Sequence, residues 1–110
     1  MDKVSLGVDI NEVDRCKLIK VLTDELPVLR AKIGISQSEI SNIIGVSRQT
    51  YSAIETQKRD MSWNIFLSLI LFFEHNEKTR DMIESIGAFP FSLQQMLNVD
   101  KREGVKNKDV

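Results

Sequence analysis

The sequence predicts an all-α protein of about five helices with an extension at each end. Its 110 residues suffice for a single domain with a modest core. Only two prolines and five glycines occur. Apolar residues recur at three- and four-residue spacing, with little of the alternation that marks strands. These observations favour helices throughout the chain.

Residues 36–55 predict two short helices joined by a tight turn. Ser36 is a good N-cap, and Glu39 three residues later completes a capping box. Gly45 is expected to end the first helix, because a residue at positive φ is least strained without a Cβ. Three residues at helical spacing give this helix one apolar face: Ile40, Ile43 and Ile44.

A second helix is predicted over residues 48–55. Ser47 is its expected N-cap, and Val46 is expected to be buried in the turn before it. Only Tyr51 and Ile54 have the spacing to face inward. The outward face is left with small or hydrogen-bonding side chains, namely Arg48, Gln49, Ser52 and Ala53.

This stretch resembles the helix-turn-helix of the phage-repressor and Cro-like (XRE-type) family of bacterial transcription regulators. Counted from Gln37, the family has apolar residues at its fourth, eighth, tenth, fifteenth and eighteenth positions, here Ile40, Ile44, Val46, Tyr51 and Ile54. Its small fifth residue and its ninth-position glycine correspond to Ser41 and Gly45. Serine at 41 and an aromatic at 51 depart from the usual alanine and aliphatic residue. The resemblance runs from about Leu26 to His75, less than half of the chain.

The resemblance implies a lambda-repressor-like domain of four to five helices that binds double-stranded DNA through helix 48–55 in the major groove. Arg48 suits guanine and Gln49 suits adenine, each through a bidentate pair of hydrogen bonds. Ser52 and Ala53 complete the base-contacting set. The expected phosphate contacts are Gln37, Ser47, Thr50, Lys58 and Arg59. The alternative is that Arg48 and Gln49 only solvate a helix face.

Two further expectations come from the family pattern. Related repressors pair a basic residue with an acidic one at the end of the recognition helix, which implies a bidentate ion pair between Arg30 and Glu55. The alternative is two independent surface charges. Gln57 occupies the place where the family usually has glycine, in the loop after the recognition helix.

The charge distribution agrees with a DNA-binding face. The whole chain has a formal net charge of −1, but residues 26–59 carry +3 and residues 60–100 carry −4. A DNA-binding surface needs a local positive field and not a basic protein. The basic block coincides with the helix-turn-helix.

Before the motif, we expect an arm and an extra helix over residues 1–22, with Asn11 as its N-cap. The helix-turn-helix domain is expected over residues 23–75. Thr23 or Asp24 would cap its first helix, Pro27 would fall in the first turn, and Gly34 would end it.

After the motif, Ser62 is the expected cap of a strongly apolar helix, residues 63–73, that is buried on nearly every side. The N-terminal helix, the C-terminal segment or a second subunit would cover it. Residues 76–98 are expected to form a C-terminal helical extension and possible dimer contact, and 99–110 a flexible tail. Within the extension, one helix spans residues 80–86, and Ser92 caps another over residues 93–97. Four residues are expected to dock on the apolar helix: Phe89, Phe91, Leu93 and Met96.

No catalytic, metal or cofactor site is expected. The single cysteine, Cys16, excludes an internal disulfide and is interpreted as a small apolar core residue. His75, the only histidine, is expected to lie at a helix end. No signal peptide is recognised at the start, and the apolar stretch from 61 to 73 is too short to cross a bilayer. A cytoplasmic protein that is not an enzyme is therefore predicted.

Taken together, these features predict a small DNA-binding transcription regulator that acts as a homodimer, with no small-molecule effector evident. The alternative is a protein-interaction module, such as an antitoxin-like subunit. Such a module would use the apolar helix 63–73 and the C-terminal extension to bind a partner protein.

Overall fold

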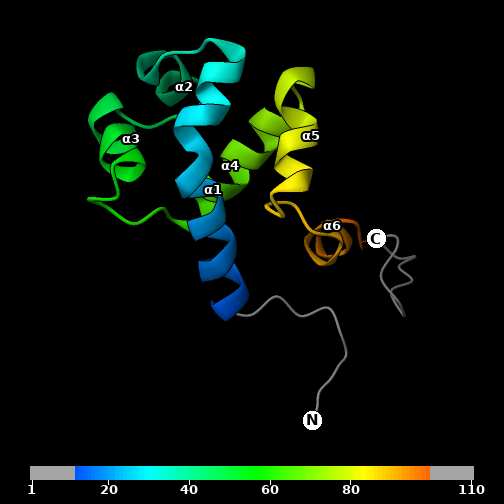
Figure 1. Cartoon of the computed structure of the whole chain (residues 1–110). Coiled ribbons are helices and arrows are strands. Elements are labelled where there is room, and N and C mark those ends of the chain that lie inside the picture. The colour runs from blue at the N-terminus through cyan, green and yellow to red at the C-terminus, as the bar shows by residue number, and fades with distance from the viewer. Residues whose placement is uncertain (1–11, 100–110) are drawn as a thin grey trace, which may run out of the picture.

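The computed structural model describes residues 12–99, and this part of the chain is all-α (Figure 1). The predicted cap at Asn11 and most of the predicted arm and tail lie outside the described residues. Six helices follow one another in the chain: α1 Glu12–Ile33, α2 Gln37–Ile44, α3 Arg48–Glu55, α4 Trp63–Glu74, α5 Glu77–Ser85 and α6 Phe91–Leu97. None of the helices within residues 12–99 combines the length and the apolar character needed to cross a membrane.

The first helix is longer than predicted, because α1 runs unbroken through the expected helix start at Thr23 or Asp24. Pro27 lies inside the helix and not in its first turn. An internal proline costs about 3 kcal/mol. The buried face of α1 outweighs this cost, since each fully buried leucine contributes about 1.5–3 kcal/mol. Three leucines on that face are completely buried: Leu22, Leu26 and Leu29.

Three of the four predicted serine caps are confirmed. Ser36, Ser47 and Ser62 each accept a hydrogen bond from the backbone N–H three residues later, and Ser36 forms the complete capping box with Glu39. Gly45 has a φ of 85°, as its place at the end of α2 requires. The sequence therefore defines the start of every helix from α2 to α4.

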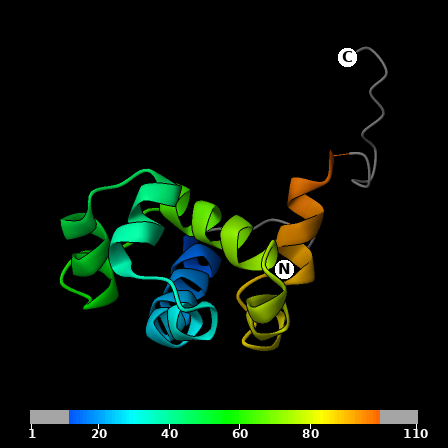
Figure 2. The ribbon, with the colours of Figure 1, turned by 90° about the horizontal axis from the view of Figure 1, so that it is seen from above.

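Helix α4 forms the centre of the core, with α1, α2 and α5 packed against it (Figures 1 and 2). Among the three predicted ways to cover α4, the N-terminal helix and the C-terminal segment both contribute. The Trp63 ring stacks on Phe66 with centroids 4.8 Å apart, and the Arg15 guanidinium lies 5.0 Å from the Trp63 ring centroid. The prediction of burial on nearly every side is wrong at Leu71, which is 69% exposed.

Three other predicted burials are also wrong. Ile43 is 57% exposed, because the inward face of α2 is carried by Ile40 and Ser41, with Ile44 half-buried. Val46 is half-buried and not fully enclosed. Cys16 is exposed on α1, because Leu18 and Leu22 take the inward positions of this helix.

The first helix of the C-terminal extension begins earlier than predicted. Helix α5 starts at Glu77 and not at residue 80, with Asn76 in the N-cap position. Helix α6 starts at Phe91 behind Pro90, so Ser92 lies inside the helix and does not cap it. Leu93 is fully buried and Phe89 and Met96 pack partly against the core, whereas Phe91 is 71% exposed.

The loop after α3 contains a non-glycine residue in the left-handed region, Gln57, with a φ of 64°. The Gln57 N–H donates to the Ile54 carbonyl at 3.0 Å, and the Lys58 N–H donates to the Ala53 carbonyl at 2.8 Å. This paired arrangement is the one that usually places glycine at the C′ position of a helix. The unusual residue at 57 therefore carries backbone strain.

We expect Gln57→Gly to raise the free energy of unfolding by up to about 1 kcal/mol, because glycine removes the steric cost of the left-handed conformation. The greater freedom of glycine in the unfolded chain offsets part of this gain. Urea denaturation measures the change. Lys58→Gly is the control and should destabilise the protein, and a Gln57→Gly variant less stable than the wild type would contradict the interpretation.

Candidate nucleic-acid interface

The candidate interface is the outward face of α3 together with the loop that follows it. Tyr51 and Ile54 are completely buried and fix α3 on the core, as their spacing predicts. Arg48 and Gln49, at the opposite side, are exposed at the N-terminal end of the helix. No described residue forms an ion pair with Arg48. The Arg48–Gln49 edge is thus accessible for contact with a partner.

The remaining predicted contact residues surround this edge with different degrees of exposure. Ser52, Ala53 and Thr50 are half-buried, and the Ser47 hydroxyl donates to the Thr50 hydroxyl at 3.0 Å. Lys58 and Arg59 are exposed in the loop after α3. The fold therefore brings the predicted base-contacting residues onto one helix and two predicted phosphate-contacting cations onto the adjoining loop.

Helix α3 is held against α1 by the ion pair that the family resemblance implies. Arg30 Nε and Nη2 donate to the two carboxylate oxygens of Glu55, at 3.0 and 2.9 Å. The side chains are 20% and 6% exposed, respectively. Arg30 Nη1 also donates to the Ile35 carbonyl at 3.1 Å. The hydrogen bonds that Arg30 donates to Glu55 raise the pKa of the guanidinium, so Arg30 stays charged.

Two further polar side chains, those of Gln37 and Tyr51, lie near this ion pair. Gln37 Nε2 donates weakly to Glu55 Oε1 at 3.4 Å, a contact that links α2 to α3. The Tyr51 hydroxyl is buried and has no hydrogen-bond partner among the described residues. Burial, followed by the nearby Glu55 carboxylate, raises the pKa of Tyr51, so it stays protonated at neutral pH. The contact of Gln37 with Glu55 was not predicted, because neither residue spacing nor the family pattern indicates it.

The N-terminus of α2 supplies backbone donors beside the interface. The first N–H groups of a helix have no intrahelical partner, so those of Gln37 and Ser38 can bind a phosphate oxygen. The Glu39 side chain accepts from the Ser36 N–H at 2.9 Å, and this hydrogen bond lowers the pKa of Glu39. Glu39 is therefore ionised at neutral pH and places one negative charge at the same helix end.

Comparison with known proteins supports the assignment of this region. A family model described as Helix-turn-helix matches residues 29–62, from the last turn of α1 to the N-cap of α4. The matched region is thus a helix-turn-helix of a DNA-binding family. This match agrees with the resemblance of residues 36–55 to the phage-repressor and Cro-like, XRE-type helix-turn-helix family. No curated protein and no solved structure matches the chain significantly.

The described residues contain no cluster that suggests metal chemistry. Within residues 12–99, no three histidine, cysteine, aspartate or glutamate side chains gather closely enough to hold a metal ion. His75 lies at the C-cap of α4, with its backbone N–H donating to the Leu71 carbonyl at 3.1 Å.

Proposed function

We propose that this protein binds double-stranded DNA in a sequence-specific manner, as a small bacterial or phage transcription regulator of the repressor type. The observation that carries the proposal is the exposed Arg48–Gln49 edge at the N-terminal end of a rigidly held α3. In helix-turn-helix complexes this end of the recognition helix meets the base edges in the major groove. A homodimer is part of the proposal, because one such helix reads only a few base pairs.

Each group of side chains has a separate role in this proposal. Arg48 donates two hydrogen bonds to guanine O6 and N7, and Gln49 pairs with adenine N6 and N7. Ser52 and Ala53 contact neighbouring base edges or a thymine methyl group. The phosphate backbone is bound by five residues, Gln37, Ser47, Thr50, Lys58 and Arg59. The base contacts give sequence preference, and the phosphate contacts give orientation and salt-dependent affinity.

The test is selection of bound duplexes from a random library, followed by measurement of variants on the selected site. Arg48→Ala and Gln49→Ala should each weaken binding to the selected duplex by about 1–3 kcal/mol and leave binding to random duplex nearly unchanged. Arg59→Ala should instead weaken binding to all duplexes alike. It should also reduce the salt dependence of the binding constant by about one released counterion.

Lys78→Ala is the matched control, because it removes one exposed positive charge on α5, away from α3. It should leave binding to the selected duplex unchanged. If no duplex is enriched in the selection, or if Arg48→Ala and Lys78→Ala have equal effects, the proposed mode of binding is wrong.

One observation favours a second candidate, a module that binds a partner protein. Ile43 on α2 and Leu71 on α4 are both exposed, and they line one hollow together with Ile44 and Phe72. Exposed apolar side chains that share a hollow are typical of interaction surfaces. This second function is supported if the selection enriches no duplex and the wild type binds a protein partner. Leu71→Asp should then abolish binding to that partner.

A further inference from the structure

We propose that the N-terminal segment of this chain, residues 4–10, binds in an extended conformation along the exposed apolar face of α6. One chain thereby covers its own α6, and no second copy takes part. The inference goes beyond the proposed function and does not rest on it, because neither the contact nor its tests involve DNA.

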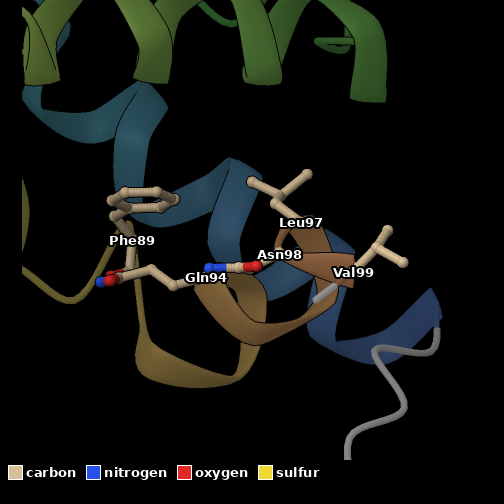
Figure 3. A pocket seen from close by; sticks show the side chains of 5 residues that line it. All are labelled: Phe89, Gln94, Leu97, Asn98 and Val99. Atoms are coloured by element: carbon tan, nitrogen blue, oxygen red, sulfur yellow. The ribbon is translucent and has the colours of Figure 1, made fainter. Parts of the chain in front are cut away.

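The first observation is an apolar surface that the described residues leave uncovered. Six large apolar side chains are exposed within residues 12–99, and three of them lie in one short stretch: Phe91 is 71% exposed, Leu97 53% and Val99 48%. Leu97 and Val99 also line a hollow of about 520 Å³ (Figure 3). Covering apolar surface of this kind removes it from water and is stabilising.

The second observation is the composition of the chain outside the described residues. Residues 1–11 carry four apolar side chains at alternate positions, namely Val4, Leu6, Val8 and Ile10. Alternate side chains of an extended segment point to the same side, so these four can face one surface. Residues 100–110 have seven charged side chains and only two apolar ones. The N-terminal segment is therefore the part of the chain that suits the α6 face.

The third observation is the match in charge. Residues 86–99 contain no charged side chain, and neither do residues 4–8. Burying a charge without a partner is costly, so an uncharged face favours an uncharged segment. The hollow beside Cys16 is also near the start of α1, but three charged side chains border it. It suits an apolar segment less well than α6 does.

The fourth observation is the reach of the segment. Figure 1 shows α6 at the end of the domain where α1 begins, with α2 at the other end. The eight steps from Glu12 back to Val4 span at most about 29 Å. The hollow beside Ile43 and Leu71 adjoins α2, which follows the far end of α1, and the 22 residues of α1 span about 33 Å. The α6 hollow is therefore the one that the segment can cover.

The α6 hollow also offers hydrogen-bond partners for an extended backbone. Figure 3 shows the amides of Gln94 and Asn98 between the Phe89 ring on one side and Leu97 and Val99 on the other. Gln94 Nε2 donates to the Phe89 carbonyl at 3.0 Å, which leaves Gln94 Oε1 able to accept from a backbone N–H. The Asn98 amide supplies both a donor and an acceptor. Backbone groups that lose water on docking can therefore find partners in this hollow.

A disulfide trap tests the contact directly. Leu6→Cys combined with Leu97→Cys, in a full-length Cys16→Ser background, should form a disulfide within one chain on mild oxidation. The product should keep the mass of a monomer on a non-reducing gel and lose both free thiols. The control is Leu6→Cys combined with Leu71→Cys, since Leu71 is also an exposed leucine. Its oxidation should be slower by roughly tenfold or more, because the segment does not lie near α4.

Two results of the trap would overturn the proposal. Equal rates for the two cysteine pairs, including no reaction of either, would show that the segment does not prefer the α6 face. A disulfide that joins two chains would show that a second copy covers this face.

Thermal unfolding gives an independent measurement. Leu6→Asp should lower the melting temperature by about 5 °C, because it places a charge against the uncharged face. Ser5→Asp adds the same charge on the other side of an extended segment and should shift the melting temperature by less than about 1 °C. The shift for Leu6→Asp should persist at tenfold lower protein concentration, since the contact lies within one chain. Equal shifts for the two variants, or a shift that disappears on dilution, would contradict the proposal.

Discussion

Replacing Arg30 with alanine is expected to lower the free energy of unfolding by about 3 kcal/mol or more. The loss arises mainly from Glu55, whose carboxylate is only 6% exposed and keeps just the weak hydrogen bond from Gln37 once the guanidinium is gone. Urea denaturation should show a lower midpoint with an unchanged slope. For a domain of this size the melting temperature should fall on the order of 10 °C.

A double-mutant cycle separates the ion pair from other effects of the substitution. Adding Glu55→Gln to Arg30→Ala should recover part of the lost stability, because the neutral amide is less costly to leave without a cation. Lys32→Ala, an exposed cation on the same helix, is the control and should change stability little. An unaltered melting temperature in Arg30→Ala would show that the pair does not support the fold.

The second large effect is expected from Leu22→Ala, which should cost about 2–5 kcal/mol. Leu22 is completely buried in α1, and truncation leaves a cavity that the surrounding helices can fill only in part. The result matters because Leu22 lies in the region that the sequence assigns to an extra helix outside the helix-turn-helix domain. A large loss shows that this region belongs to the same core.

Val28→Ala is the matched control for Leu22→Ala. Val28 is an exposed apolar residue on the same helix, so its truncation should have a small effect on unfolding by urea. If both substitutions cost the same, the first half of α1 contributes no more to the core than a surface residue does.

Local sequence signals predicted the elements that depend on local chemistry. The serine caps at 36, 47 and 62 and the glycine at 45 satisfy backbone groups within a few residues, so their roles can be derived from spacing alone. The helix-turn-helix followed from the family pattern for the same reason. The predicted DNA contacts of Arg48 and its neighbours stay predictions until a duplex is tested.

Tertiary packing determined what sequence signals could not predict. The proline at 27 indicated a helix start, but three buried leucines hold α1 continuous across it. The exposure of Ile43, Leu71 and Phe91 depends on where neighbouring helices end, which apolar spacing does not reveal. The contact between Gln37 and Glu55 likewise requires α2 and α3 to be placed in space.

The uninterrupted α1 fixes the distance between its contacts with α3 and with the loop that follows α3. Arg30 donates hydrogen bonds to Glu55 at the end of α3. Six residues earlier on α1, Asp24 Oδ1 accepts a hydrogen bond from Gln57 Nε2 at 3.4 Å. Gln57 lies in the loop that also contains Lys58 and Arg59. One residue inserted between Asp24 and Arg30 would rotate these two anchor points by about 100° relative to each other. The number of residues between them is therefore fixed by geometry, although neither anchor is among the proposed DNA contacts.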